Sequence, residues 1–272
     1  MGITLAELPV FKNKRHFRWP KIFIIFIAIL YCSLSFAEDD HTHETFFETF
    51  FKDLASPVLT EASPWFYGGV IATISATLLE DQFSDPAQEE FIDHKPIGEL
   101  SPWGDYAGQM IPNALYAVGM ASHGWITGKR TSKARALLMT KATLYSGAVT
   151  TILKHTIREP RPGDPSDKTA FPSGHSATAF AFASVVGAEH EWYWGLAAYG
   201  LASLTALSRM NDNMHELHHV IGGLTIGLSY GIGLHYRNTM KRTVSKKEMN
   251  QIYYSMIPVG FNGGVFQILC VF

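Results

Sequence analysis

The sequence predicts an all-α protein, a bundle of about six core helices followed by a small C-terminal β-hairpin. Apolar stretches of helical length recur along the middle of the chain, and 47% of the residues are hydrophobic while 17% are charged. Glycine and other small residues are spread through these stretches, which favours close helix packing. Proline-rich breaks separate several of them. Helices packed against one another are therefore the expected architecture.

The N-terminus is expected to be a cleavable secretory signal, residues 1–37. Five basic residues precede an apolar run from Ile22 to Ala37, which closes with Ser35-Phe36-Ala37. Small residues at −3 and −1 are typical of a cleavage site, and the run is short for a bilayer span. An uncleaved membrane anchor is the alternative. The chain is expected to be exported, either periplasmic or attached to a periplasm-facing membrane.

An acidic and aromatic arm, residues 38–60, comes next. Its phenylalanines are spaced for one face of a short amphipathic helix, which we expect to be buried against the protein, with a membrane surface as the alternative. A helix is predicted to start at Ser63-Pro64 and continue to Leu79. Three prolines interrupt the polar segment from Asp81 to Pro102, so it is predicted to be a long connection.

The helical domain is expected to span residues 61–240. Its further helices are predicted at 105–126, 132–157, 174–188, 192–209 and 213–236. Four prolines and a glycine between Glu159 and Pro172 exclude helix there. Most apolar runs are shorter than about 20 residues, and the segment 132–157 carries several charges, which favours a soluble or peripheral bundle over a polytopic membrane protein.

The C-terminal tail, residues 241–272, differs from the domain before it. A basic patch is followed by two strand-like runs on either side of Asn262-Gly263, a strong hairpin turn signal. We expect a strand pair packed on the bundle. Cleavage of the signal would leave Cys270 as the only thiol, so no internal disulfide is expected.

The charge of the chain excludes one class of partner. The formal net charge is −2, and no long basic face is offered to a phosphate backbone, so nucleic-acid binding is not expected.

Three segments concentrate residues that suit phosphate chemistry. They read KHTIREPRP from Lys154, FPSGH from Phe171, and SRMNDNMHELHH from Ser208. A phosphoryl group in transfer spreads negative charge over its oxygens, so it needs fixed cations and N–H donors. Guanidinium groups bind such oxygens in bidentate fashion, and a helix start after Pro172 offers free N–H groups. Two histidines, His175 and His215, could then act on opposite sides of phosphorus.

These segments resemble the three motifs of the type 2 phosphatidic acid phosphatase superfamily, K-x6-R-P, P-S-G-H and S-R-x5-H-x3-D, a superfamily that also holds bacterial acid phosphatases and vanadium haloperoxidases. The resemblance implies an all-α fold and a metal-independent phosphatase without a cofactor, acting on a phosphate ester or lipid phosphate. It implies that His215 attacks phosphorus to form a phosphohistidine and that His175 protonates the leaving oxygen. The residues implied to bind phosphate are Lys154, Arg161, Ser173, Gly174 and Arg209.

One position departs from the third motif, where His219 replaces the expected Asp. The family's Asp accepts a hydrogen bond from the nucleophilic histidine and stabilises its charged form. We expect His219 to share a helix face with His215 and to reach it. Because an imidazole brings no negative charge, turnover should be weaker, unless Asp212 or Glu216 supplies the carboxylate.

Two other functions compete with this interpretation. His215-Glu216-Leu217-His218-His219 spells H-E-x-x-H, by which a helix offers two imidazoles to zinc, so a zinc-dependent hydrolase is one alternative. An inactive phosphate-binding relative is another, while the haloperoxidase branch fits poorly because this chain is short. The remaining histidines are expected to be surface or packing groups: His94, His123, His155, His190, His218 and His235.

Overall fold

The computed structural model describes residues 45–249, 252–258 and 264–270. The predicted signal, residues 1–37, and the start of the arm lie outside the described residues. The helices are α2 (Phe46–Leu54), α3 (Ser56–Leu59), α4 (Ser63–Leu78), α5 (Asp85–His94), α6 (Ser101–Gly108), α7 (Ile111–Thr127), α8 (Arg130–Ile157), α9 (Gly174–Glu189), α10 (Trp192–Asn211) and α11 (Leu217–Met249). A π-helical turn (Glu80–Ser84) and a 3-10 turn (Gly98–Leu100) connect α4, α5 and α6, and the strands are β1 (Ile252–Pro258) and β2 (Gly264–Cys270).

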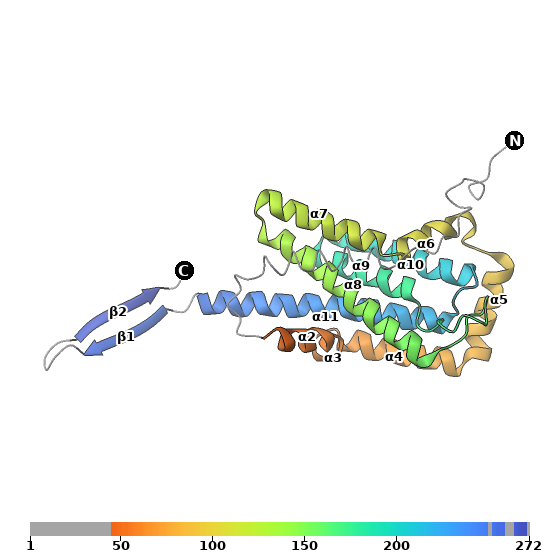
Figure 1. Cartoon of the computed structure of the whole chain (residues 1–272), viewed down its shortest axis with the longest axis horizontal. Helices are drawn as coiled ribbons and strands as arrows, with labels where there is room; N and C mark the ends of the chain where they lie inside the picture. The colour runs from red at the N-terminus through yellow and green to blue at the C-terminus, as the bar shows by residue number, and fades with distance from the viewer. Residues whose placement is uncertain (1–44, 250–251, 259–263, 271–272) are drawn as a thin grey trace.

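The fold is mostly helical, as predicted, and six helices have 16 residues or more: α4, α7, α8, α9, α10 and α11. The predictions for 132–157, 174–188 and 192–209 correspond closely to α8, α9 and α10. Helix α9 is the centre of the bundle, because ten of its 16 residues are buried and it packs on α8, α10 and α11. Figure 1 shows this layered arrangement of long helices.

Helices α9 and α11 approach each other through glycine. A Cβ atom added at Gly223 would collide with the carbonyl oxygen of Ser173, and one at Gly227 with that of Ala177. Only the absence of a side chain lets the two backbones come this close. This contact places the start of α9 directly beside the start of α11.

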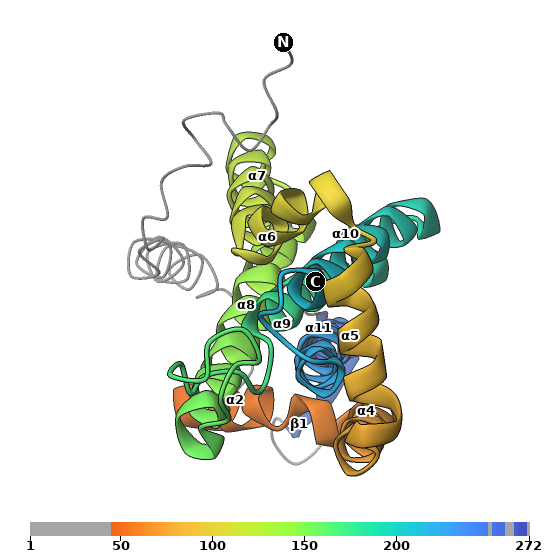
Figure 2. The ribbon, with the colours of Figure 1, turned by 90° about the vertical axis from the view of Figure 1, so that its right-hand side faces the viewer.

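The ends of four long helices meet at one end of the bundle. Helices α8 and α10 finish there, and α9 and α11 begin there, so the loops that join them lie together (Figures 1 and 2). Figure 2 looks onto this end and shows the two loops in front of α8, α9 and α11. All three sequence segments singled out above contribute to this end.

Two predicted boundaries are wrong because the prolines between Asp81 and Pro102 were interpreted as helix breakers. The segment from Asp81 to Pro102 contains α5 and the start of α6, and the predicted helix 105–126 is two helices, separated at Met110, which has a left-handed φ of 64°. Helices α5, α6 and α7 each carry proline in their first turn. Proline is tolerated there because the first N–H groups of a helix have no partner within it.

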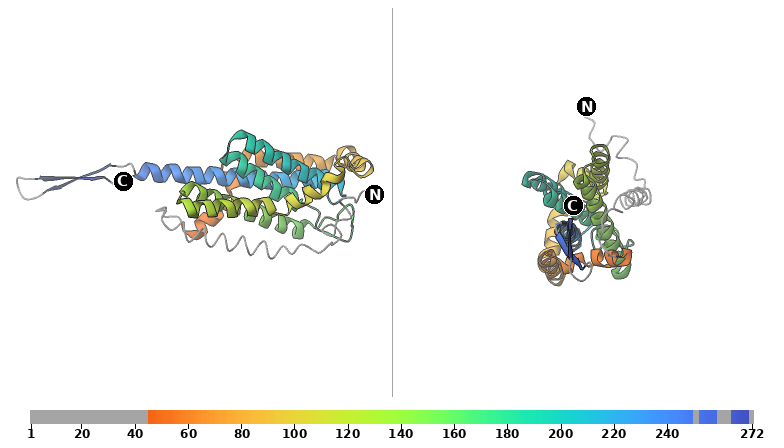
Figure 3. Two further views of the ribbon diagram at one scale, coloured as in Figure 1. Left: turned by 90° about the horizontal axis from the view of Figure 1, so that it is seen from above. Right: turned by 90° about the vertical axis from the view of Figure 1, so that its left-hand side faces the viewer.

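The last helix also differs from its prediction. Helix α11 begins at Leu217 rather than at residue 213, and it continues to Met249, past the boundary expected at residue 240. Figure 3 shows it projecting beyond the other helices. Strands β1 and β2 pair antiparallel, with Ile252 opposite Cys270. The turn at Asn262-Gly263 lies outside the described residues, so the hairpin and its packing stay predictions.

The aromatic arm forms a helix, as predicted, but its phenylalanines are not buried. Helix α2 begins with a capping box between Thr45 and Glu48, while Phe46 and Phe47 are 69% and 70% exposed. The buried carboxylate of Asp53 anchors the helix, since it lies 2.7 Å from Lys141 Nζ and 2.6 Å from Arg237 Nε. These ionic contacts and the ring contact of Phe50 with Tyr145 hold α2 against the bundle.

The glycine contact between α9 and α11 gives a stability prediction. Gly227→Ala should lower the free energy of unfolding by about 1–3 kcal/mol, because the added methyl group overpacks a closed backbone contact. The matched control is Gly200→Ala, at a helical glycine with nothing within 4 Å of an added Cβ, which should be neutral or stabilising by about 1 kcal/mol. Denaturant unfolding of the two variants is the measurement. Equal effects would contradict the proposed constraint.

Candidate active site

The end of α8 and the loop after it hold the first two cations. Lys154 lies in the last turn of α8 and donates to the carbonyl oxygens of Thr169 and Ala170. Arg161 Nε lies 2.7 Å from Asp167 Oδ2, and its guanidinium also donates to Thr169 at 3.3 Å. Burial and the neighbouring charge of Arg161 lower the pKa of Lys154 to about 7. One loop thus holds both cations.

The start of α9 supplies the backbone donors. Ser173 is the N-cap, and its side chain accepts from the amide of Ser176. The amide of Ser173 donates to the carbonyl oxygen of His219 at 2.9 Å, which ties this helix start to α11. A Cβ atom at Gly174 would lie 3.7 Å from Lys154 Cε, so the lysine side chain passes close to the helix start. Free N–H groups and a cation therefore face the same place.

Arg209 and His175 are joined by a carboxylate that sequence reasoning missed. Asp105 Oδ1, from α6, lies 2.6 Å from Arg209 Nη1 and 3.2 Å from His175 Nε2. Arg209 also contacts Asp212 at 3.0 Å. Burial alone would raise the pKa of Asp105, but the hydrogen bond from His175 and the charge of Arg209 lower it to about 2. Asp105 thus holds His175 and Arg209 next to each other.

His215 is buried in the loop before α11, only 2% exposed. Its amide donates to the carbonyl oxygen of Arg209 at 3.2 Å, which places it next to that cation. Burial and the charge of Lys154 lower its pKa far below the usual range. A neutral imidazole has a free lone pair, which a nucleophile needs. Among the described residues, its Nδ1 has no hydrogen-bond partner.

The expectation that His219 reaches His215 is wrong. The ring centroids are 5.6 Å apart, and both nitrogens of His219 are engaged elsewhere: Nδ1 accepts from the amide of Glu216 at 3.0 Å, and Nε2 donates to Glu159 at 2.7 Å. Asp212 contacts Arg209 and Ser101 instead. In the described part of the chain neither suggested carboxylate bonds to the Nδ1 of His215.

Glu159 is the second carboxylate that sequence reasoning missed. One of its oxygens accepts from His218 Nε2 at 2.8 Å and from His219 Nε2 at 2.7 Å. Burial alone would raise the pKa of Glu159, but these two hydrogen bonds lower it to about 2. The only sequence signal for Glu159 is its place among the six unspecified residues of K-x6-R-P. The pattern allows any residue type there.

The H-E-x-x-H interpretation required His215 and His219 on one face of a helix. Helix α11 begins at Leu217, so His215 and Glu216 precede it, and both nitrogens of His219 bond to other groups. The structure therefore does not form the zinc-protease helix that the letters suggested.

Comparison with known proteins agrees with this geometry. Residues 135–242 match the family model described as the PAP2 superfamily. This part of the helical domain is therefore similar to the PAP2 superfamily. The matched residues include every position that sequence reasoning placed in the site.

Among curated proteins, a similar relative is the lipid A 1-phosphatase of Porphyromonas gingivalis, 30% identical over 165 residues. The match covers 58% of this chain and 35% of the relative, so the aligned part spans about a third of the relative's length. No solved structure matches the chain.

The contact between Asp105 and His175 predicts a pH effect. Burial lowers the pKa of His175, and the contact with Asp105 raises it. Asp105→Asn removes the negative charge of this contact, so the pKa of His175 should fall further. A general acid is active while protonated, and its activity is lost as pH rises through its pKa. The basic limb of the kcat/KM profile should therefore move to lower pH. Glu61→Gln, at an exposed position, is the control; an unmoved basic limb in Asp105→Asn would refute the coupling.

Proposed function

We propose that the protein is an exported, membrane-associated lipid phosphatase that hydrolyses a phosphate monoester through a phosphohistidine at His215. The observation that carries this proposal is the meeting of Lys154, Arg161 and Arg209 with the buried His215 and the partly buried His175 at one end of the bundle. The three sequence segments that supply these residues lie within the part of the chain that matches the PAP2 superfamily, which supports the proposal.

The chemical step follows from the two histidines. His215 attacks phosphorus while the bond to the leaving oxygen breaks, and His175 gives its proton to that oxygen. A water molecule then loses a proton to His175 and attacks the phosphohistidine, which releases inorganic phosphate and restores His215. Fixed cations stabilise the charge on the equatorial oxygens in both steps. These residues supply the nucleophile, the acid and the cations that stabilise charge, and the proposed steps use no metal ion.

Substrate entry must rearrange the pocket. The carboxylate of Asp105 lies on Arg209 and His175, and two anions cannot share one arginine fork without repulsion. A phosphate would displace Asp105 from Arg209 and take over that contact. The carbonyl oxygens now bound by Lys154 would likewise yield to a phosphate oxygen, which keeps the ammonium charged.

Exposed apolar side chains support a lipid substrate. They lie on three helices: Trp65, Tyr67, Ile71, Ile74 and Leu78 on α4; Leu115, Val118, Trp125 and Ile126 on α7; and Trp192, Tyr193, Trp194 and Leu196 on α10. Large exposed apolar patches mark contact with a membrane or a partner. By length and composition, Arg130–Ile157 and Leu217–Thr239 could cross a membrane, although most of the second is buried as in a core helix. A membrane-associated enzyme would meet its phosphate on a lipid headgroup.

One observation favours a second candidate, a relative that binds phosphate without turnover. His219 stands in place of the family's Asp, and the Nδ1 of His215 lacks a hydrogen bond among the described residues. A nucleophile without an orienting carboxylate turns over slowly.

His215→Ala should abolish turnover of a phosphatidate-type lipid in detergent micelles and of a soluble phosphate ester, by at least ~10⁴-fold. His175→Ala should do the same, whereas His123→Ala, whose ring bonds to Ser132, should be unaffected. Vanadate should inhibit, and quenched parent enzyme should carry an acid-labile phosphohistidine. The lipid should have the higher kcat/KM. Retained turnover in His215→Ala would refute the nucleophile assignment.

His219→Asp should keep kcat or raise it by up to ~10²-fold, because a carboxylate at this position can orient His215 and stabilise its positive charge. His219→Asn has the same size but no charge, so it should not gain. The ratio of kcat for these two variants on one substrate is the measurement. If both variants lose turnover equally, the missing carboxylate is not what limits the rate.

A further inference from the structure

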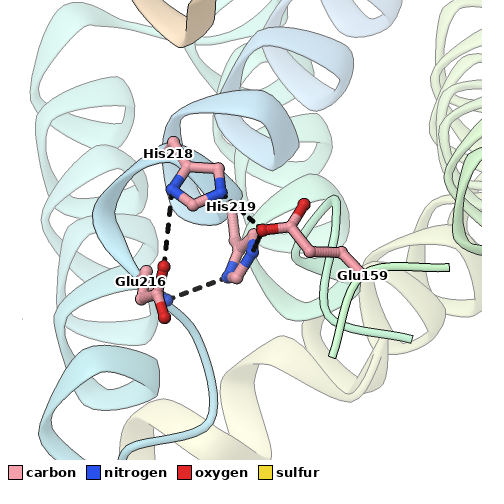
Figure 4. A group of neighbouring side chains, drawn as sticks. All are labelled: Glu159, Glu216, His218 and His219. Atoms are coloured by element: carbon pink, nitrogen blue, oxygen red, sulfur yellow. Dashed lines mark hydrogen bonds and ion pairs between the residues drawn. The ribbon is translucent and has the colours of Figure 1, made fainter. Parts of the chain in front are cut away.

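A second polar cluster lies beside the phosphate site and has no part in the proposed reaction. Glu159, Glu216, His218 and His219 each offer one ligand atom, and these four atoms lie within 4.8 Å of one another. Figure 4 shows the two imidazoles between the two carboxylates, with Glu159 at the Nε2 atoms of both rings and Glu216 on the Nδ1 side of His218. Glu159 comes from the loop after α8, and the other three from the start of α11.

The cluster is buried, and one of its nitrogens is unsatisfied. His218 and His219 are 1% and 0% exposed. Among the described residues, the buried Nδ1 of His218 has no hydrogen-bond partner and faces Glu216 Oε2 at 3.7 Å. Buried polar atoms without partners are rare, and an imidazole nitrogen of this kind is suited to bind a metal ion. The side chains of Glu159 and Glu216 are 29% and 19% exposed, which gives an ion a path from solvent.

The charge of the cluster also favours a cation. Glu80, at the start of the π-helical turn after α4, adjoins Glu216, so a third carboxyl group lies near the centre. Buried charges are usually paired or coordinate a metal, and a divalent cation would balance these carboxylates.

We propose that Glu159, Glu216, His218 and His219 bind one divalent transition-metal ion of the zinc type. Two imidazole nitrogens and two carboxylate oxygens make a tetrahedral ligand set that suits Zn²⁺. Calcium and magnesium instead prefer oxygen ligands alone, in larger number. The site differs from the H-E-x-x-H interpretation, because it uses Glu159 and His218 and leaves His215 free for phosphorus.

The four ligands do not contribute equally. The Nδ1 of His218 is unbonded and lies beside Glu216, so this ring can offer Nδ1 to the metal while its Nε2 keeps the hydrogen bond to Glu159. Coordination through His219 Nε2 instead requires the amide of Glu216 to give up its bond to Nδ1. His218 can therefore bind the metal without giving up another hydrogen bond. Removal of its side chain should weaken metal binding most clearly.

The position of the ion would make it an organiser of the active site. Glu159 lies two residues before Arg161, and Glu216 follows His215 directly. A metal held by both segments would fix a phosphate-binding arginine relative to the nucleophile. It would act through these positions and would not touch the reacting phosphorus.

The test is zinc binding by the purified full chain in detergent after removal of metals with a chelator. Equilibrium dialysis should give one tightly bound Zn²⁺ per chain, and zinc should raise the unfolding temperature. His218→Ala and the nearly isosteric Glu216→Gln should weaken binding at least about tenfold and lose the thermal shift. His235→Ala is the matched control, since His235 lies on the same helix and contacts a single carboxylate, Glu189.

Far-ultraviolet circular dichroism shows whether each variant keeps its helices, and Glu216→Gln preserves the shape of the side chain if His218→Ala does not fold. No bound zinc in the parent, or equal binding in the parent and a folded Glu216→Gln, would overturn the site. Because occupancy is measured without substrate, this result is independent of the proposed function. A phosphatase that binds no zinc would contradict the metal site alone.

Discussion

The backbone contact between α9 and α11 is the constraint on which the rest of the site depends. Gly223 and Gly227 allow the start of α11 to lie against the start of α9, and the amide of Ser173 then reaches the carbonyl oxygen of His219. That single hydrogen bond joins the second sequence motif to the third. The helix-start amides that would cradle phosphate and the histidine that would attack it are thereby positioned by the same pair of backbones.

A site built for a multiply charged anion has to be stable without it. Lys154 and the two arginines lie close together in a largely buried place, and each is held by a carboxylate or by carbonyl oxygens. Asp105 is the most informative of these partners because it contacts both Arg209 and His175. The contacts that stabilise the phosphate-free protein are therefore those that a phosphate substrate would have to replace. The affinity for substrate would then depend on the free energy needed to break them.

The sequence predicted the helical fold and the cations and histidines of the site, because these residues lie at fixed spacings within three short segments. It did not predict Asp105 or Glu159, since a carboxylate that works by reaching across the fold leaves no local pattern. Proline misled the assignment between α4 and α7, because the same residue that breaks a helix interior suits its first turn. The interpretation of His219 was wrong for a related reason: its ring does lie beside His215, but its two nitrogens bond to the amide of Glu216 and to Glu159, which spacing alone does not reveal.

The substitution at position 219 is best understood together with Glu159. In the family's third motif a carboxylate serves the nucleophile directly, whereas here His219 turns away from His215 and donates to Glu159. Glu159 accepts a second hydrogen bond from His218, so its charge is shared between two imidazoles rather than given to one nucleophile. Negative charge is thus present near His215 but is committed to holding the loop against α11. An ion bound by the same residues would strengthen that link between Arg161 and His215, so the altered motif exchanges direct activation of the nucleophile for a firmer geometry around it.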